Sequence, residues 1–254
     1  MVPRVLTVAS SDSGGGAGIQ ADLKAFAAAG CHGMSAVVAL TAQNTVGVSA
    51  IHELPPEFVT AQLDAVFDDI GLDAAKTGML FSARLIEAVA DFFAQHRVPL
   101  VVDPVMVASS GAKLLEADAV DVLVTRLFPL ATVVTPNADE ATALVGPGDL
   151  EEQARRLVDL GAAAAIVTGG GAGDHLFDGE TALEIPVRRH DVAATHGSGC
   201  THSATLAALL ARGESLLTAA VLAAATASDS VEHGLDGLGS GPGPVDVFHL
   251  KGRR

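Results

Sequence analysis

The chain has no tryptophan and no tyrosine, and its large aromatic residues are nine phenylalanines. Stacking on a tryptophan or tyrosine ring is therefore excluded as a way of binding a ligand. Basic residues are also few, because 15 lysines and arginines stand against 30 acidic residues and leave a formal net charge of −15. This balance argues against nucleic acid or an anionic membrane as a partner. An anionic substrate would have to be held by local N–H groups and a metal ion.

Cysteine is scarce too. Cys31 and Cys200 are the only two, so at most one disulfide is possible, and a reducing cytoplasm fits this composition. Residues 1–10 lack the pattern of a signal peptide, and we expect none. The most apolar stretch, Leu216–Ala227, is short and interrupted by threonines, which favours a buried core helix over a membrane span. We therefore expect a cytoplasmic protein.

What the chain does contain is a long alternation of strand and helix patterns. Apolar runs of strand length are Val5–Ala9, Ser35–Thr41, Asp73–Thr77, Leu100–Val102, Thr132–Thr135 and Ala163–Val167, and a late hairpin is expected from His175–Phe177 and Ala182–Val187. Helical patterns are Ala17–Ala29, Pro56–Asp69, Ser82–His96, Leu114–Leu127, Leu150–Leu160, Cys200–Arg212 and Glu214–Glu232. This order predicts an α/β protein with a mostly parallel sheet covered on both faces. Without repeats or long linkers, we expect one domain over residues 1–254.

Ligands of open parallel sheets bind beyond the carboxyl ends of the strands. Polar or glycine-rich clusters fall at such ends at Ser10–Gly18, Thr41–Thr45, Lys76–Met79, Asp103–Val105, Thr135–Glu140 and Thr168–Gly171. We expect these clusters to converge on one site.

The most informative segment is Thr195–Thr201, which reads Thr-His-Gly-Ser-Gly-Cys-Thr and opens a long helix. Two glycines let backbone N–H groups approach a ligand closely, and the start of a helix favours an anion such as a phosphoryl group. Cys200 lies in the first turn, where the helix field is expected to lower the thiol pKa and make it a base or a nucleophile. A purely structural Gly-Ser-Gly turn is the alternative reading.

The other clusters have structural alternatives as well. The glycine-rich Ser10–Asp22 segment is neither a P-loop nor a dinucleotide fingerprint, and a flexible strand–helix turn explains it equally well. The amide of Gln43 suits the edge of an aminopyrimidine, although a turn also explains it. Asp103 is a candidate Mg²⁺ ligand or a cap. Asn137 and Glu140 form either a capping box or a metal–phosphate face.

Taken together, these motifs resemble the hydroxymethylpyrimidine/phosphomethylpyrimidine kinases, the thiamine-pathway branch of the ribokinase superfamily. The resemblance covers nearly the whole chain in order. It rests on Ser11-Asp12, Gly15–Lys24, Ala42–Thr45, Lys76–Leu80, Asp103–Met106, Thr135–Glu140 and Thr195–Thr201.

The resemblance implies a ribokinase-like three-layer α/β/α sandwich and a homodimeric enzyme that uses ATP and Mg²⁺. It implies two successive reactions at one site: phosphorylation of 4-amino-5-hydroxymethyl-2-methylpyrimidine, then of its monophosphate to the diphosphate. By motif, it assigns Asp22, Gln43, Met79, Ser11 and Ala17 to the pyrimidine, Asn137, Thr168, Gly170 and Thr195 to the nucleotide, Asp103 and Glu140 to the metal, Gly197, Ser198 and Gly199 to the anion hole, and Cys200 to the role of base.

Two departures from the family pattern remove expected lysines near the phosphates. Thr168–Gly171 replaces a Lys-Gly-Gly-His-like segment, and Ser109–Gly111 replaces Lys-Ser-Gly. Lys113 is close enough in sequence to compensate for one of them. We expect the missing lysines to affect the affinity for ATP more than any other property.

Three other functions remain open from the sequence. A pyridoxal/pyridoxine kinase of the same fold would also take a hydroxymethyl group on a nitrogen ring. A non-catalytic pyrimidine-binding protein would explain the missing lysines. A cysteine hydrolase would use Cys200 with His196, but it gives no reason for the clusters at Asp103 and Asn137–Glu140.

Overall fold

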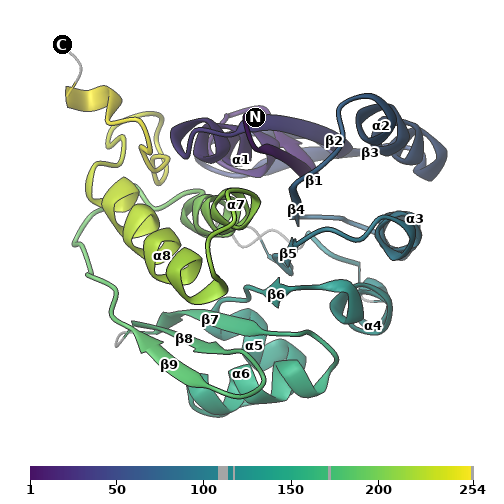
Figure 1. The fold of residues 1–254 in the computed structure, drawn as a ribbon. Coiled ribbons are helices and arrows are strands. Elements are labelled where there is room, and N and C mark those ends of the chain that lie inside the picture. Colours follow the sequence, from purple (N-terminus) through teal and green to yellow (C-terminus); the bar gives the residue numbers. More distant parts are fainter. Residues whose placement is uncertain (108–113, 117, 171–172, 253–254) are drawn as a thin grey trace.

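A computed structural model describes residues 1–107, 114–116, 118–170 and 173–252. Nine strands form one sheet in the order β3-β2-β1-β4-β5-β6-β7-β8-β9 (Figure 1). The strands are β1 (Arg4–Asp12), β2 (His32–Gln43), β3 (Val48–Glu53), β4 (Ala74–Thr77), β5 (Leu100–Val102), β6 (Val133–Val134), β7 (Ala165–Gly170), β8 (Gly173–Phe177) and β9 (Ala182–Ile185). The helices are α1 (Gly18–Ala28), α2 (Pro56–Asp69), α3 (Ala83–Gln95), α4 (Ala119–Val122), α5 (Ala138–Val145), α6 (Leu150–Asp159), α7 (Ser198–Ala211) and α8 (Leu216–Glu232).

The centre of the sheet is parallel, as the apolar runs predict. Strands β2, β1, β4, β5, β6 and β7 pair in parallel, whereas β3, β8 and β9 pair antiparallel at the two edges. Every residue of β4, β5 and β6 is buried. Strands covered on both faces read as continuous apolar runs rather than as alternating patterns.

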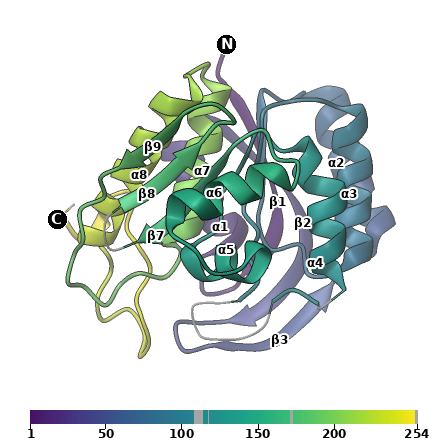
Figure 2. The ribbon, with the colours of Figure 1, turned by 90° about the horizontal axis from the view of Figure 1, so that it is seen from below.

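Helices cover both faces of the sheet and give three layers (Figures 1 and 2). Successive strand side chains point to opposite faces. Leu6 and Val8 of β1 accordingly join a core with residues of α2 to α6, and Val5 joins a second core with residues of α1, α7 and α8. The expected α/β/α sandwich is confirmed.

One strand was not predicted, and two local expectations were wrong. β3 escaped notice because it is an edge strand with no residue fully buried, so it carries no apolar run. The pattern at Leu114–Leu127 is not one helix: it contains the short α4, a π-helical turn at Leu123–Leu127 and then a 3-10 turn at Phe128–Leu130, where Pro129 lacks the N–H that a continuing helix needs. The second wrong expectation concerns α8, which is a surface helix rather than a buried one.

On α8, four alanines are buried while Leu217, Val221 and Leu222 are exposed. Small residues on the inner face let the helix pack closely on the sheet and α7. Among the helices that the structure describes, none combines the length and apolar character needed to cross a membrane.

Candidate active site

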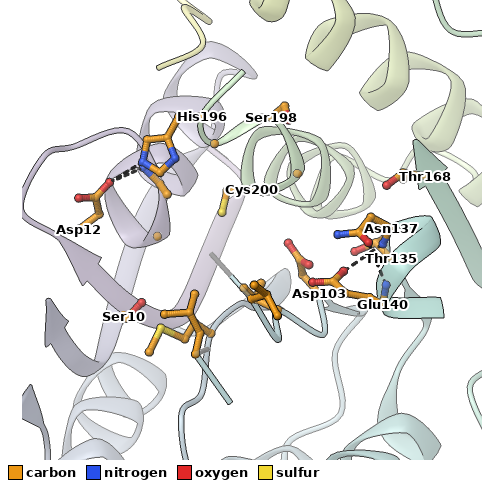
Figure 3. A pocket seen from close by; sticks show the side chains of 18 of the residues that line it. Ser10, Asp12, Asp103, Thr135, Asn137, Glu140, Thr168, His196, Ser198 and Cys200 are labelled. Atoms are coloured by element: carbon orange, nitrogen blue, oxygen red, sulfur yellow. Dashed lines mark hydrogen bonds and ion pairs between the residues drawn. The ribbon is translucent and has the colours of Figure 1, made fainter. Parts of the chain in front are cut away.

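The carboxyl ends of the parallel strands border a cavity of about 290 Å³ (Figure 3). Its walls come from all six strand-end clusters that we expected to converge, and from the start of α7. The lining residues are Ser10, Asp12, Ala17, Gly18, Gln43, Lys76, Met79, Asp103, Val105, Val107, Leu114, Thr135, Asn137, Glu140, Thr168, Gly169, His196, Gly197, Ser198, Gly199 and Cys200. From the cluster at Thr168–Gly171, the lining includes Thr168 and Gly169.

The start of α7 forms the end of the cavity suited to an anion. Gly197 precedes the helix with a φ of 84°, and a Cβ there would lie 1.8 Å from the carbonyl oxygen of Gly16. Only glycine fits this position, because a side chain meets both a steric overlap and an unfavourable backbone conformation. Gly199, the second residue of α7, has open space where a Cβ would be. The N–H of Ser198 donates to the carbonyl oxygen of Thr195 at 3.2 Å. The next N–H groups of α7, those of Gly199 and Cys200, have no partner within the helix and are available to an anion.

Cys200 is half-buried at this end of the cavity, and its thiol differs from expectation. Burial raises the pKa of the Cys200 thiol to about 12, although the nearby charge of Lys76 and the N–H of Gly18 act in the opposite direction. The expectation of a lowered pKa was wrong, because desolvation outweighs the favourable charges around the sulfur. In the free protein at neutral pH, Cys200 is a thiol.

A buried ion pair lies at the floor of the cavity, with Lys76 in the lining and Asp22 behind it. The ammonium of Lys76 is 3.0 Å from each carboxylate oxygen of Asp22 and 3.9 Å from Asp103, and the side chains of Lys76 and Asp22 are fully buried. Burial opposes the charge on Lys76, but Asp22, Cys200 and Asp103 outweigh burial and raise its pKa. Lys76 therefore keeps a positive charge at the base of the site.

A second polar contact joins distant parts of the chain across the cavity. Nε2 of His196 lies 3.1 Å from Oδ2 of Asp12, whose carboxylate also accepts hydrogen bonds from the N–H groups of Gly14, Gly16 and Ala17. Burial acts to raise the pKa of Asp12, but these hydrogen bonds outweigh burial and lower it. Asp12 thus holds the glycine-rich loop in shape as an ionised group.

His196 is directed at Asp12 rather than at Cys200 (Figure 3). A cysteine hydrolase would need the imidazole to take the proton of the thiol. This arrangement counts against that alternative.

Two carboxylates lie at the opposite wall. Asn137 and Glu140 form the predicted capping box at the start of α5, and Glu140 Oε1 also accepts from the N–H of Met106 at 3.3 Å. Asp103 accepts from the hydroxyl of Ser203 at 2.8 Å. Burial, and then the charge of Asp103, raise the pKa of Glu140 to about 7. The two carboxylates repel each other, so a cation between them would be stabilised.

The wall that the pyrimidine was expected to contact is lined by Gln43, Met79 and Ala17. The rest of the lining includes the residues predicted for the nucleotide, the metal, the anion hole and the base: Asn137, Thr168, Asp103, Glu140, Gly197, Ser198, Gly199 and Cys200. Three predicted residues do not line the cavity. Asp22 lies behind Lys76, Ser11 accepts a hydrogen bond from Gln20, and Thr195 lies outside the lining. Gly170 is the last residue of β7, and its contact with the nucleotide stays a prediction. Ser109–Gly111 and Lys113 lie outside the described residues.

Sequence reasoning assigned no catalytic or binding role to Lys76, Asp12 or Thr135, and it considered Asp12 only as a local cap. Lys76 stood in a strand-end cluster, but an expected parallel strand gives no sign that its lysine is fully buried and paired. Thr135 is buried, and within the part of the chain that the structure describes its hydroxyl has no hydrogen-bond partner. A buried, unpaired hydroxyl at the cavity wall is available to a ligand.

Comparisons with known proteins agree with the motifs. The family described as phosphomethylpyrimidine kinase matches residues 12–246. A hydroxymethylpyrimidine/phosphomethylpyrimidine kinase from Rhizobium meliloti (strain 1021) is 46% identical over 266 residues, which cover 98% of each chain.

Solved structures of similar proteins share the fold of this chain. A Bacillus subtilis pyridoxal kinase in an ADP complex is 36% identical with a TM-score of 0.90 over 99% of each chain. A phosphomethylpyrimidine kinase from Clostridium difficile 630 is 35% identical with a TM-score of 0.81, covering 91% of this chain and 100% of the other. The ribokinase-like fold is confirmed, and the chain belongs to the phosphomethylpyrimidine kinase family.

Proposed function

We propose that this protein transfers the γ-phosphoryl group of ATP to 4-amino-5-hydroxymethyl-2-methylpyrimidine, and then phosphorylates the monophosphate to the diphosphate. One observation carries the proposal: a single cavity joins an amide and thioether wall, an anion-binding helix start and a pair of carboxylates. An acceptor alcohol, a transferring phosphoryl group and a metal-bound nucleotide need these three surfaces in one place.

The residues present fit a magnesium ion. Asp103 and Glu140 both line the cavity, and the charge of Asp103 raises the pKa of Glu140. Mg²⁺ prefers carboxylate oxygens and would relieve this repulsion. Bound there, it would neutralise charge on the phosphates. The Asn137–Glu140 capping box fixes the carboxylate of Glu140 by its backbone bonds, so the residue serves both as a cap and as a ligand.

The chain's own groups would act on the transferring phosphoryl group from the other side. We assign the N–H groups of Gly197, Gly199 and Cys200 to its oxygens, where developing charge is stabilised by preorganised donors. Lys76 supplies a fixed positive charge near Cys200 and Asp103, in place of the lysines that the chain lacks elsewhere. Gln43 and Met79 would hold the ring.

Cys200 is assigned to accept the hydroxymethyl proton in the first reaction. Because its pKa is about 12, only a small fraction is thiolate at neutral pH, and this fraction grows about tenfold per pH unit. We expect the rate of the first step to rise with pH between pH 7 and 9. The second acceptor is already an anion and needs little help from a base, so its rate should stay nearly flat.

Substitution of the cysteine tests this assignment. Cys200→Ala should slow the first phosphorylation by about 10²-fold or more and the second much less, measured as separate initial rates with each acceptor. Cys31→Ala is the matched control, because that cysteine is buried away from the cavity lining. Equal losses in both steps, or identical pH profiles, would contradict the role of Cys200 as base.

A pyridoxine kinase is the second candidate, since a pyridoxal kinase is among the solved structures with a TM-score of 0.90. ATP turnover with hydroxymethylpyrimidine, its monophosphate and pyridoxine, each with and without Mg²⁺, tests the choice. We expect turnover of both pyrimidines only with Mg²⁺. Preference for pyridoxine would favour the second candidate, and tight pyrimidine binding without ATP consumption would favour a binding protein.

The homodimer, the single domain and the cytoplasmic location stay predictions. Light scattering of the purified chain checks the first, because a dimer doubles the 25.6 kDa mass of the chain.

A further inference from the structure

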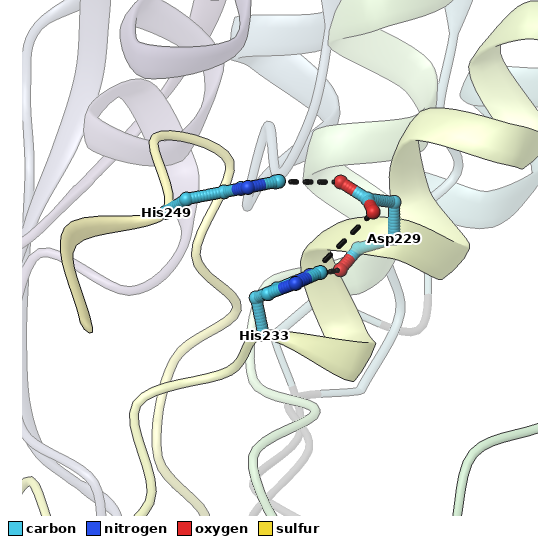
Figure 4. A group of neighbouring side chains, drawn as sticks. All are labelled: Asp229, His233 and His249. Carbon is cyan, nitrogen blue, oxygen red and sulfur yellow. Dashed lines mark hydrogen bonds and ion pairs between the residues drawn. The ribbon is translucent and has the colours of Figure 1, made fainter. Parts of the chain in front are cut away.

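A carboxylate and two imidazoles lie together outside the cavity lining, where α8 meets the C-terminal segment (Figure 4). Asp229 stands in the last turns of α8, His233 caps the end of that helix, and His249 comes from the segment that follows. Nε2 of His249 is 2.7 Å from Oδ2 of Asp229, and Nδ1 of His233 is 3.5 Å from Oδ1. The two rings stack with centroids 4.1 Å apart.

Within the described residues, this is the one group of three histidine, cysteine or acidic side chains whose ligand atoms all lie within 4.8 Å of one another. Bonds of about 2.0–2.2 Å in a tetrahedral zinc site place ligand atoms roughly 3.4 Å apart. The present distances lie on both sides of that spacing. Small side-chain rotations therefore bring the three atoms around one ion.

Binding has an identifiable local cost. The nearly parallel rings, 11° apart, must turn away from each other so that both can point at one ion. Nδ1 of His233 must also leave the backbone oxygen of Asp229, which lies at 2.9 Å. The three side chains are between 42% and 49% exposed, so water can reach them and complete the coordination.

We propose that Asp229, His233 and His249 form a site for a divalent transition-metal ion, with zinc as its preferred occupant. Imidazole nitrogens suit zinc, nickel and copper, whereas magnesium prefers an all-oxygen set. The site is thus distinct in chemistry from the carboxylate pair at the cavity. A net charge of −15 makes the surroundings favourable for a cation.

The ion would fasten the C-terminal segment to α8. Two backbone hydrogen bonds already hold that segment in place. The N–H of Asp246 donates to the carbonyl oxygen of Ser230 on α8, and the N–H of Val245 donates to the carbonyl oxygen of His196, just before α7. A ligand that binds only the folded state stabilises it. Zinc should therefore raise the melting temperature of the protein.

The test is calorimetric titration of zinc ions into the chelator-treated full chain, in the presence of excess Mg²⁺. We expect saturable binding of one equivalent, a higher melting temperature, and no displacement by Mg²⁺. His249→Ala and His233→Ala should each weaken binding by at least about tenfold, since losing even an outer-shell partner of a metal ligand costs about 10- to 100-fold.

His52→Ala is the matched control, because His52 is an exposed histidine on β3, outside the cluster. It should bind zinc as the unaltered chain does. A Cys31→Ser, Cys200→Ser double variant should also bind one equivalent of zinc, which distinguishes this site from zinc binding by thiols. The proposal would be overturned if zinc did not bind saturably to the unaltered chain. It would also be overturned if both histidine variants bound zinc as tightly as the unaltered chain while their circular dichroism showed a native fold.

Discussion

At the scale of single residues, burial decides how the charged groups of the site behave. Cys200 and Glu140 both lie among other titratable groups, and in both the cost of desolvation raises the pKa. Lys76 is more deeply buried, yet it keeps its charge because it contacts a carboxylate directly. The contact with Asp22 offsets burial for Lys76, although burial still outweighs Lys76 in Asp22 itself and raises the pKa of that carboxyl.

The ion pair at the floor of the cavity should therefore be essential for stability. Asp22→Asn leaves the ammonium of Lys76 fully buried without its direct carboxylate partner, and removing one member of a buried pair costs roughly 3–5 kcal/mol. We expect a loss of this size in the free energy of unfolding measured by urea denaturation.

A half-exposed pair provides the comparison. Arg4 and Asp73 also form an ion pair, but their side chains are 34% and 32% exposed. Asp73→Asn should cost no more than about 1 kcal/mol, because water screens the charges. Equal losses in the two variants would mean that burial does not set the contribution of Asp22.

At the scale of elements, the connection into α7 couples two loops. The carbonyl of Gly16 occupies the space that a side chain on Gly197 would need, so the glycine-rich loop and the start of α7 pack backbone against backbone. Gly197 precedes α7 with a φ of 84°, and the first residues of the helix line the cavity. We therefore expect this element to bind an anion through its backbone groups.

Substituting Gly197 and Gly199 one at a time distinguishes a role in packing from a role in ligand binding. Gly197→Ala should destabilise the protein by at least about 1–2 kcal/mol from its backbone conformation alone, with the overlap added. Gly199→Ala meets open space and should leave stability nearly unchanged, while lowering ATP turnover if that space receives a phosphate. Urea denaturation and steady-state kinetics of both variants measure these effects. A stable Gly197→Ala variant would contradict the close packing.

At the scale of the whole molecule, the cavity is assembled from segments far apart in the chain. Asp12 and His196 lie 184 positions apart and meet at its rim. Behind them, the tail also contacts the loop after β2, where the N–H of Gly241 donates to the hydroxyl of Thr45. Tertiary contacts from both ends of the chain therefore hold the loops that surround the ligand.

Removing the contact at the rim should loosen those loops more than the core. We expect His196→Ala to raise the KM for the acceptor and to speed hydrogen exchange at Gly14–Ala17, since a hydrogen bond to a charged group contributes about 1.5–3 kcal/mol. His32→Ala, at an exposed position near the opposite end of β2, should change neither. Unchanged exchange in His196→Ala would mean that Asp12 alone holds the loop.

The alternation of apolar runs and helical patterns determined the layered sheet, because strands covered on both faces must be continuously apolar. The motifs at the strand ends likewise predicted where the cavity lies, since parallel strands bring their carboxyl ends to one edge. The edge strand β3 and the interrupted helix at Leu114–Leu127 could not be predicted in this way, because edge pairing and a mid-helix change of geometry leave no periodic signal.

The tertiary structure alone decided the protonation of the site and which motif residues reach the cavity. Cys200 looked like a thiolate from its place at a helix start, but its pKa depends on how much protein surrounds the sulfur. Asp22 looked like a pocket residue and is instead the buried partner of Lys76. Desolvation and pairing depend on groups distant in sequence, so only the packed structure sets them.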